Sequence, residues 1–257
     1  MRPEPKFVTN EPAVLFGKTL VIADLHIGVE YELYKSGIRI PKQTEKLLAR
    51  VKKLIKTTRA NRLVLLGDLK HFIPYLSFQE MHEIPNFLEE LSHLVKVDIV
   101  PGNHDGDLKK FLPTSVEFHE TSGFRLDNVY FNHGHSWPNE DIFDSDYLVI
   151  GHIHPCIEFR DKLGFRFIEQ AWIKLNMDKK RLLRHYKSTD IDRKVKDLKI
   201  IIIPAFNRFV GGRPFGAGEG NAPVIRLADA RNAEARLLDG TDIGKLAKFG
   251  NFGSQKT

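Results

Sequence analysis

Five short apolar runs recur along the chain, each rich in β-branched residues and bounded by Gly, Pro, Asn or Asp. Runs of this length predict buried strands rather than membrane spans. They cover residues 19–23, 62–66, 95–100, 129–131 and 147–150. Two longer segments with helical period separate the first three runs. Strand, helix, strand, helix, strand is typical of parallel β-α-β units, which place functional groups at the carboxyl ends of their strands.

The two helical segments, residues 43–59 and 77–94, each have one apolar face. In the first, the residues of this face are Leu47, Leu48, Val51, Leu54 and Ile55. In the second they are Met81, Ile84, Leu88 and Leu91. Ser77 and Glu80 have the spacing of a capping box, which predicts the start of the second helix. Pro85 is expected to kink or split that helix.

The last hundred residues predict strands more often than helices. Short strand-like pieces there indicate a second, mostly antiparallel sheet. They are residues 157–160, 165–175, 181–186, 199–204, 223–227 and 234–238. No internal repeat or independent linker is visible. We therefore expect residues 1–257 to form a single domain, with a basic, mainly β C-terminal part from about residue 155.

Charge is distributed unevenly along the chain. Residues 1–154 contain 18 Lys and Arg against 21 Asp and Glu, whereas residues 155–257 contain 21 against 12. The basic part includes Lys179, Lys180 and Arg181, and clusters of this kind attract phosphate backbones. The alternative interpretation is the solvated face of a lysine-rich protein. The cluster is therefore a candidate nucleic-acid-binding site.

Targeting and redox features are few. No stretch approaches the roughly 18 apolar residues of a membrane-spanning helix, and the first residues lack the pattern of a secretory signal. We therefore expect a cytoplasmic protein with no membrane partner. Cys156 is the only cysteine, which excludes an internal disulfide and a cysteine-based zinc site.

Carboxylate, amide and imidazole side chains follow all five apolar runs. They are Asp24 and His26; Asp68; Asn103, His104 and Asp105; His133 and His135; and His152 and His154. We expect these groups to converge along one edge of a sheet, with glycines allowing the tight turns. In an extended chain His152 and His154 would share a face, while Ile153 would point to the other. Among eleven histidines such a pair can also arise by chance, so its meaning depends on the other four runs.

The ordered set DxH, GD, GNHD, HGH and GHxH, over roughly residues 19–155, resembles the signature of the calcineurin-like metallophosphoesterase superfamily. The resemblance implies a four-layer α/β/β/α sandwich of two mixed sheets flanked by helices, with a dinuclear metal centre. It implies Asp24, His26 and His154 as ligands of the first metal. It implies Asn103, His133 and His152 as ligands of the second, with Asp68 bridging both.

The implied ligand set is chemically consistent. Oxygen and nitrogen ligands without a thiolate suit Mn, Fe, Zn or Ni better than Cu(I), and two Mn²⁺ ions are our first expectation. Two ions about 3.5–4 Å apart acidify a shared water and offset the charge that develops on phosphorus. The resemblance thus implies a metal-bound hydroxide as the nucleophile.

The remaining polar residues of the motifs have expected roles as well. The resemblance implies that His104 is the general acid, which protonates the leaving oxygen. Asp105 either orients His104 or caps a short helix over residues 105–112. His71 and His135 are candidates for substrate contact, although His135 would also fit a role in shaping the turn.

The strings GDLKH, HGHSWP and IIIPAFN are similar to those of SbcD-related or ligase-associated (PdeM-type) phosphoesterases. This similarity and the basic C-terminal part favour a hydrolase that acts on phosphodiester bonds of nucleic acid in DNA repair or processing. Single-stranded or flapped DNA, or RNA, would be the substrate, and a helicase or ligase the partner.

Two other functions are open. One is a small-molecule phosphodiesterase for cyclic nucleotides or dinucleotides. The other is a non-catalytic scaffold with the same fold, although all seven ligand positions and His104 are present in this chain.

Overall fold

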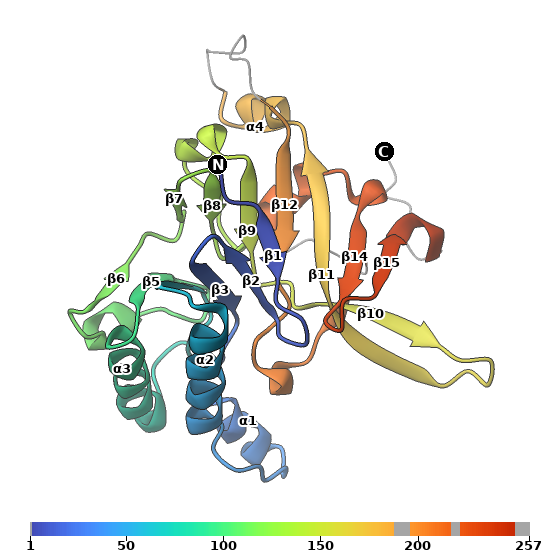
Figure 1. Cartoon of the computed structure of the whole chain (residues 1–257). Coiled ribbons are helices and arrows are strands. Elements are labelled where there is room, and N and C mark those ends of the chain that lie inside the picture. The colour runs from blue at the N-terminus through green and yellow to red at the C-terminus, as the bar shows by residue number, and fades with distance from the viewer. Residues whose placement is uncertain (1, 188–195, 217–221, 250–257) are drawn as a thin grey trace.

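The computed structural model of the chain describes residues 2–187, 196–216 and 222–249 (Figure 1). Within these ranges, no helix has the length and apolar character needed to cross a membrane.

The first sheet has six strands in the order β1-β2-β3-β4-β5-β6. Their bounds are Pro5–Phe7, Ala13–Phe16, Thr19–Ala23, Arg62–Leu66, Lys96–Val100 and Val116–Phe118. Neighbouring strands from β3 to β6 are parallel, whereas β2 pairs antiparallel with both β1 and β3. The helices α1, α2 and α3 span Val29–Lys35, Thr44–Thr58 and Phe78–Ser92. The predicted β-α-β units are therefore confirmed in this half of the chain.

The second sheet has the order β13-β10-β11-β12-β9-β8-β7, and β14 and β15 branch from β11. In chain order, β7 to β15 span Phe124–Leu126, Val129–Phe131, Tyr147–Ile150, Pro155–Arg160, Arg166–Met177, Leu198–Ile202, Arg213–Pro214, Glu234–Leu237 and Asp242–Lys245. The pairs β8–β9, β9–β12 and β10–β13 are parallel, and the other pairs are antiparallel. The sheet is therefore mixed.

Short helices accompany the second sheet and the connecting loops. The helix α4 spans Lys179–His185. Short 3-10 helices span Leu108–Phe111, Glu140–Asp144, Arg208–Val210, Pro223–Leu227, Ala230–Asn232 and Leu246–Phe249.

Three apolar layers hold the sheets and helices together. Successive side chains of a strand point to opposite faces, so Leu20 and Ile22 of β3 pack toward α2 and α3, while Val21 packs toward the second sheet. On the outer face of the second sheet, Leu182 and Leu183 of α4 pack beside the 3-10 helices. The central strands β3, β4, β5 and β9 are covered on both faces, which explains why they read as continuous apolar runs. The α/β/β/α sandwich is confirmed.

The five apolar runs all form strands, but they do not belong to one sheet. β3, β4 and β5 lie in the first sheet, and β8 and β9 lie in the second. The expectation that the polar groups converge along one edge of a single sheet was therefore wrong. They meet where the ends of the two sheets come together.

Other local expectations divide between confirmed and wrong. The capping box of Ser77 and Glu80 is present, and α3 is not split at Pro85. Met81 is 37% exposed, and Phe87 is buried in the apolar face instead. Residues 181–186, predicted as strand-like, lie in α4 and its C-cap Tyr186. Residues 223–227, also predicted as strand-like, form a 3-10 helix.

Candidate metal centre

The candidate ligands that follow β3, β4 and β9 have unusual backbone conformations. Asp24, His26, Asp68, His152 and His154 all have φ between 42° and 68°, in the left-handed region that non-glycine residues rarely adopt. The expected extended alternation of His152 and His154 is therefore wrong, because β9 ends at residue 150.

Backbone hydrogen bonds hold these turns in register. The amide of His26 donates to the carbonyl of Asp68 (2.8 Å), which joins the loops after β3 and β4. The amide of His152 donates to the Asp24 carboxylate (3.1 Å), which joins the loop after β9 to the first sheet. The strained conformations thus have a structural support that fixes the side chains.

Two glycines are needed because side chains of the site occupy the space beside them. A Cβ atom at Gly67 would lie 2.3 Å from Nδ1 of His133, and one at Gly102 would lie 2.1 Å from Oδ1 of Asp68. Real Cβ atoms do not make contacts this short. The absence of side chains at these positions lets His133 pack against the loop after β4 and Asp68 against the loop after β5.

A first cluster consists of Asp24, His26 and His154, with ligand atoms within 4.8 Å of one another. Nε2 of His154 lies 3.4 Å from Oδ1 of Asp24. The Nε2 atoms of His26 and His154 are buried, and neither has a hydrogen-bond partner in the described part of the chain. Buried nitrogens without partners are rare in folded proteins, and here they face a carboxylate across a space that fits a cation.

A second cluster consists of Asp68, His133 and His152, again with ligand atoms within 4.8 Å of one another. Nδ1 of His133 donates to the carbonyl oxygen of Leu66 (2.8 Å). Its Nε2 is buried, lies 3.4 Å from Oδ2 of Asp68 and lacks a hydrogen bond to any described residue. A backbone acceptor on one ring nitrogen is how metal-binding histidines are commonly oriented.

Asp68 lies between the two clusters. Its Oδ2 is 3.6 Å from Nε2 of His26 in the first cluster and 3.4 Å from Nε2 of His133 in the second. Its Oδ1 accepts a hydrogen bond from the amide of His104 (2.9 Å). One carboxylate therefore faces both groups of imidazoles.

Burial and the charges of the carboxylates shift the pKa values of the site's imidazoles in opposite directions. Burial lowers the pKa of His26 to about 3, despite the nearby carboxylates. Burial also opposes the charged form of His133, but Asp68 and Asp24 raise its pKa to about 9. Burial would raise the pKa of Asp68, but His133 and His26 hold it well below its usual range. The site thus favours positive charge beside its two carboxylates, as a cation-binding site would.

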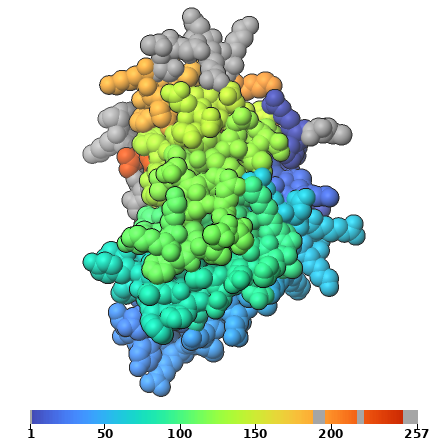
Figure 2. Space-filling model, turned by 90° about the vertical axis from the view of Figure 1, so that its left-hand side faces the viewer, coloured from blue at the N-terminus to red at the C-terminus, as the bar shows by residue number. Residues whose placement is uncertain are grey.

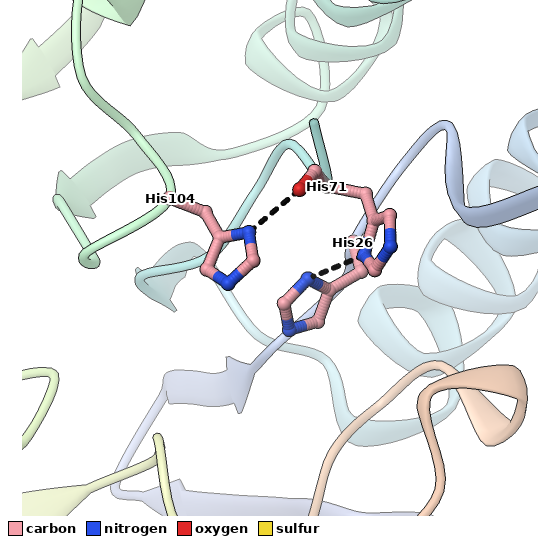
Figure 3. Close-up of side chains that lie close together, drawn as sticks. All are labelled: His26, His71 and His104. Atoms are coloured by element: carbon pink, nitrogen blue, oxygen red, sulfur yellow. Dashed lines mark hydrogen bonds between the residues drawn. The ribbon is translucent and has the colours of Figure 1, made fainter. Parts of the chain in front are cut away.

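Asn103 and His104 face the clusters from the loop after β5. Together with His26 and Asp68 they line a hollow of about 400 Å³. Nδ1 of His104 donates to the carbonyl oxygen of His71 (2.6 Å) (Figure 3). Because Nδ1 is the donor, Nε2 is the nitrogen available for proton transfer.

His71 contacts His26 and is not among the residues that line the hollow. Its Nδ1 lies 3.2 Å from Nδ1 of His26 (Figure 3), and its Nε2 contacts the Glu32 carboxylate. The arrangement that satisfies every group has His26 donating to His71 and His71 donating to Glu32. In that arrangement the lone pair of His26 is on Nε2, next to Asp24 and His154.

Glu80 is a site residue whose second role sequence reasoning missed. Its Oε1 accepts hydrogen bonds from the amides of His71 and Phe72, both at 2.8 Å. Its Oε2 completes the capping box with Ser77. The capping box was visible in the sequence, but its contact with the loop that carries His71 depends on the tertiary fold.

The structure assigns Asp105 a different task from either expected one. Its buried carboxylate accepts hydrogen bonds from the amides of Leu69 (2.9 Å), Lys70 (3.1 Å) and Gly102 (2.8 Å). Burial and the charge of Asp68 raise its pKa to about 6. Asp105 therefore fastens the loop after β4 to the loop after β5.

His135 lies beside the second cluster. Its ring centroid is 5.2 Å from that of His133 and 6.1 Å from that of His152. Burial, reinforced by these two imidazoles, lowers its pKa to about 4. His135 is therefore a neutral ring next to the cluster.

The basic cluster of α4 lies away from this centre. Lys179 is buried, and its ammonium group donates to the carbonyls of Phe143 and Ser145. Ser145 precedes β9, whereas His152 follows it, so α4 is at the opposite end of that strand (Figure 1). In the space-filling view, the orange atoms of the region around α4 lie toward the top of the molecule (Figure 2). Lys179 is thus a structural residue, and its assignment to a nucleic-acid-binding surface was wrong. Lys180 and Arg181 are exposed at that same end, and residues 188–195 of the basic segment lie outside the described residues.

Comparisons with known proteins agree with the geometry. A search of curated proteins finds no significant match. The fold is similar to that of Pseudomonas putida nuclease MPE, with 16% identity, a TM-score of 0.53, and coverage of 92% of this chain and 95% of the other. YfcE, a phosphoesterase from E. coli, has 16% identity, a TM-score of 0.41, and coverage of 89% and 98%. The model of the calcineurin-like phosphoesterase family matches residues 17–203, and the chain therefore belongs to this family of metal-dependent phosphoesterases.

Proposed function

We propose that this protein hydrolyses phosphodiester bonds of nucleic acid with two divalent metal ions. The observation that carries the dinuclear site is the pair of clusters on either side of Asp68. The Nε2 atoms of His26 and His154 in the first cluster, and of His133 in the second, are buried and have no hydrogen-bond partner among the described residues. Asp24, His26 and His154 would hold one ion, and Asn103, His133 and His152 the other. Asp68 would contact both.

When bound, the two ions supply a water of lowered pKa and offset negative charge on the phosphoryl oxygens. The residues of the chain do the rest. Hydrolysis breaks a P–O bond, and the leaving oxygen needs a proton. His104 is positioned to donate it from Nε2, because its Nδ1 is held by the His71 carbonyl (2.6 Å). The Asp68 carboxylate fixes the His104 backbone from the other side (2.9 Å).

Three observations support a nucleic-acid substrate. The hollow beside the clusters has a volume of about 400 Å³ and includes Arg213 at its rim. The chain shares its fold with a protein described as a nuclease. The C-terminal part carries the excess of basic residues. The proposal takes single-stranded or flapped DNA, or RNA, as the substrate and Mn²⁺ as the metal. It includes a role in DNA repair beside a helicase or ligase, which rests on the sequence similarities alone.

A cleavage panel tests the proposal. Single-stranded, duplex and flap DNA, RNA, a cyclic dinucleotide and a phosphomonoester are incubated with Mn²⁺, Ni²⁺, Zn²⁺ or EDTA. We expect metal-dependent cleavage of polynucleotides that weakens steeply as salt rises, because bound phosphates release counterions. Turnover of the cyclic dinucleotide alone, insensitive to salt, would instead assign the small-molecule activity.

A further inference from the structure

A second hollow adjoins the metal centre. It has a volume of about 890 Å³ and is bordered by β10 and β11, with Phe159, Phe167 and Arg208 in its lining. Gly211 and Gly212 line this hollow and the metal-centre hollow alike. The two hollows are therefore neighbours that share this glycine segment in their lining.

The loop over residues 206–213 is fastened to the metal-binding residues. The Asn207 side chain donates to the carbonyl of Leu25 (2.8 Å), between the candidate ligands Asp24 and His26. The amide of Arg213 donates to the carbonyl of His154 (3.0 Å). The loop thus places Arg213 in the first hollow and Arg208 in the second, at positions defined by the site itself.

The ribbon of β10 and β11 projects from the body of the protein (Figure 1) and exposes large apolar side chains. Leu163 is 82% exposed and Phe167 is 50% exposed. The rings of Phe159 and Phe167 are stacked, with centroids 5.1 Å apart and planes at 15°. Exposed apolar groups concentrated in one place usually mark an interaction site.

We infer that the two hollows form one groove for a single nucleic-acid strand, with phosphates bound by Arg213 and Arg208 and bases stacked on Phe159 and Phe167. Aromatic side chains beside cations are the usual means of binding single strands without sequence preference. Glu169 and Asp239 also line the second hollow. Glu169, on β11, would repel phosphates from the ribbon, and Asp239 would repel them from the turn between β14 and β15. The backbone therefore follows the arginine loop, and the bases face the ribbon.

The dimensions of the groove require an oligonucleotide. Four residues of extended chain, at about 3.3 Å each, separate Phe159 by roughly 13 Å from Pro155, the first residue of β10, which follows the candidate ligand His154. Stacked nucleotides rise about 3.4 Å each, so a mononucleotide or a cyclic dinucleotide cannot reach the stacked rings from the metal centre. This inference rests on the proposed function and names the part of the substrate that the metal centre does not contact.

The test compares kcat/KM for oligo(dT) of 3 and 12 nucleotides and for bis(p-nitrophenyl) phosphate, with Mn²⁺. The variants are Phe167→Ala and Arg213→Ala. Their controls are Leu94→Ala, with similar exposure (52%), and Arg231→Ala, an exposed arginine that lines neither hollow. We expect Phe167→Ala to lower kcat/KM for the 12-mer roughly fivefold or more relative to the small diester, the scale of one lost base stack. We expect Arg213→Ala to reduce the salt dependence of 12-mer cleavage, with a slope lower by about one ion.

The outcomes separate the groove from the proposed function. A preference of the wild type for the 12-mer over the 3-mer that Phe167→Ala removes, and the controls keep, supports the groove. If the wild type cleaves the 12-mer and neither variant differs from its control, the ribbon serves another purpose, such as a protein partner, and the inference is wrong. If the wild type cleaves no oligonucleotide, the proposed function fails and the groove fails with it.

Discussion

Gly102 offers a sharp test of how the site is built, because a side chain at this position would occupy the space that Asp68 fills. Its φ lies outside the left-handed region, so alanine is conformationally acceptable there. The added Cβ would lie 2.1 Å from Oδ1 of Asp68, and ordinary contacts begin at 3.4 Å. The carboxylate must therefore move by about 1.3 Å, the difference between these two distances. The backbone of the loop after β4 must shift as well, because the Cβ would lie 2.3 Å from the backbone nitrogen of Asp68. Gly106, four residues further on, is the matched control, because a Cβ there would contact nothing within 4 Å.

A displacement of this size should inactivate the enzyme. The Asp68 carboxylate would lose its hydrogen bond to the amide of His104 (2.9 Å) and its position between the clusters. Misplacement of a catalytic group by about 1 Å costs roughly 100-fold in rate, and overpacking of this kind costs about 1–3 kcal/mol of stability. We expect kcat/KM for bis(p-nitrophenyl) phosphate to fall at least about 100-fold in Gly102→Ala. Gly106→Ala should stay close to the wild type.

The assay is a kinetic measurement with Mn²⁺, combined with a count of bound metal after dialysis and a urea titration to confirm folding. A folded Gly102→Ala protein that keeps wild-type activity and metal content would refute the placement of Asp68 at the centre of the site.

Three further predictions test other parts of the structure. His104→Ala should keep its bound metal but cleave an oligonucleotide about 10²–10⁴-fold more slowly. The loss should be smaller with bis(p-nitrophenyl) phosphate, because its acidic leaving group needs little protonation. Equal losses on both substrates would show that His104 is not the acid. Lys179→Met should lower the free energy of unfolding by about 1.5–3 kcal/mol, because buried carbonyls lose a charged donor. Lys180→Ala should change it by less than about 0.5 kcal/mol. Similar effects of the two substitutions in urea titrations would contradict the buried position of Lys179. The Asp98 carboxylate accepts hydrogen bonds from Arg62 and His119, which outweigh its burial and lower its pKa. Its stabilising contribution should therefore be present above the unfolded-state pKa of about 3.9 and be lost as pH falls below it. The difference in free energy of unfolding between wild type and Asp98→Asn should shrink between pH 6 and pH 3. A constant difference would contradict the lowered pKa of Asp98.

Much of the fold follows from periodicity. The strands were predictable because a strand that is buried on both faces of its sheet, such as β4, reads as an uninterrupted apolar run. The two long helices were predictable from their apolar residues at helical spacing. The division of the strands between two sheets was not predictable in this way. β8 and β9 have the same apolar character as β4. Only the pairing of β9 with β12, and of β8 with β9, shows that they belong to the second sheet.

The site was predictable in its residues but not in its local geometry. The five motifs name the side chains that the structure brings together, apart from supporting residues such as Glu80. The arrangement of His152 and His154 was argued from a strand that ends before them. The burial of Lys179 depends on carbonyls more than 30 residues away in the chain, which no local pattern of charge reports.

The central claim is that two neighbouring cations share Asp68, and anomalous diffraction from a crystal grown with Mn²⁺ tests it directly. The expected map has two peaks on opposite sides of the Asp68 carboxylate, one beside His26 and His154 and the other beside His133 and His152. A single peak, or two peaks of which one lies away from Asp68, would contradict the claim.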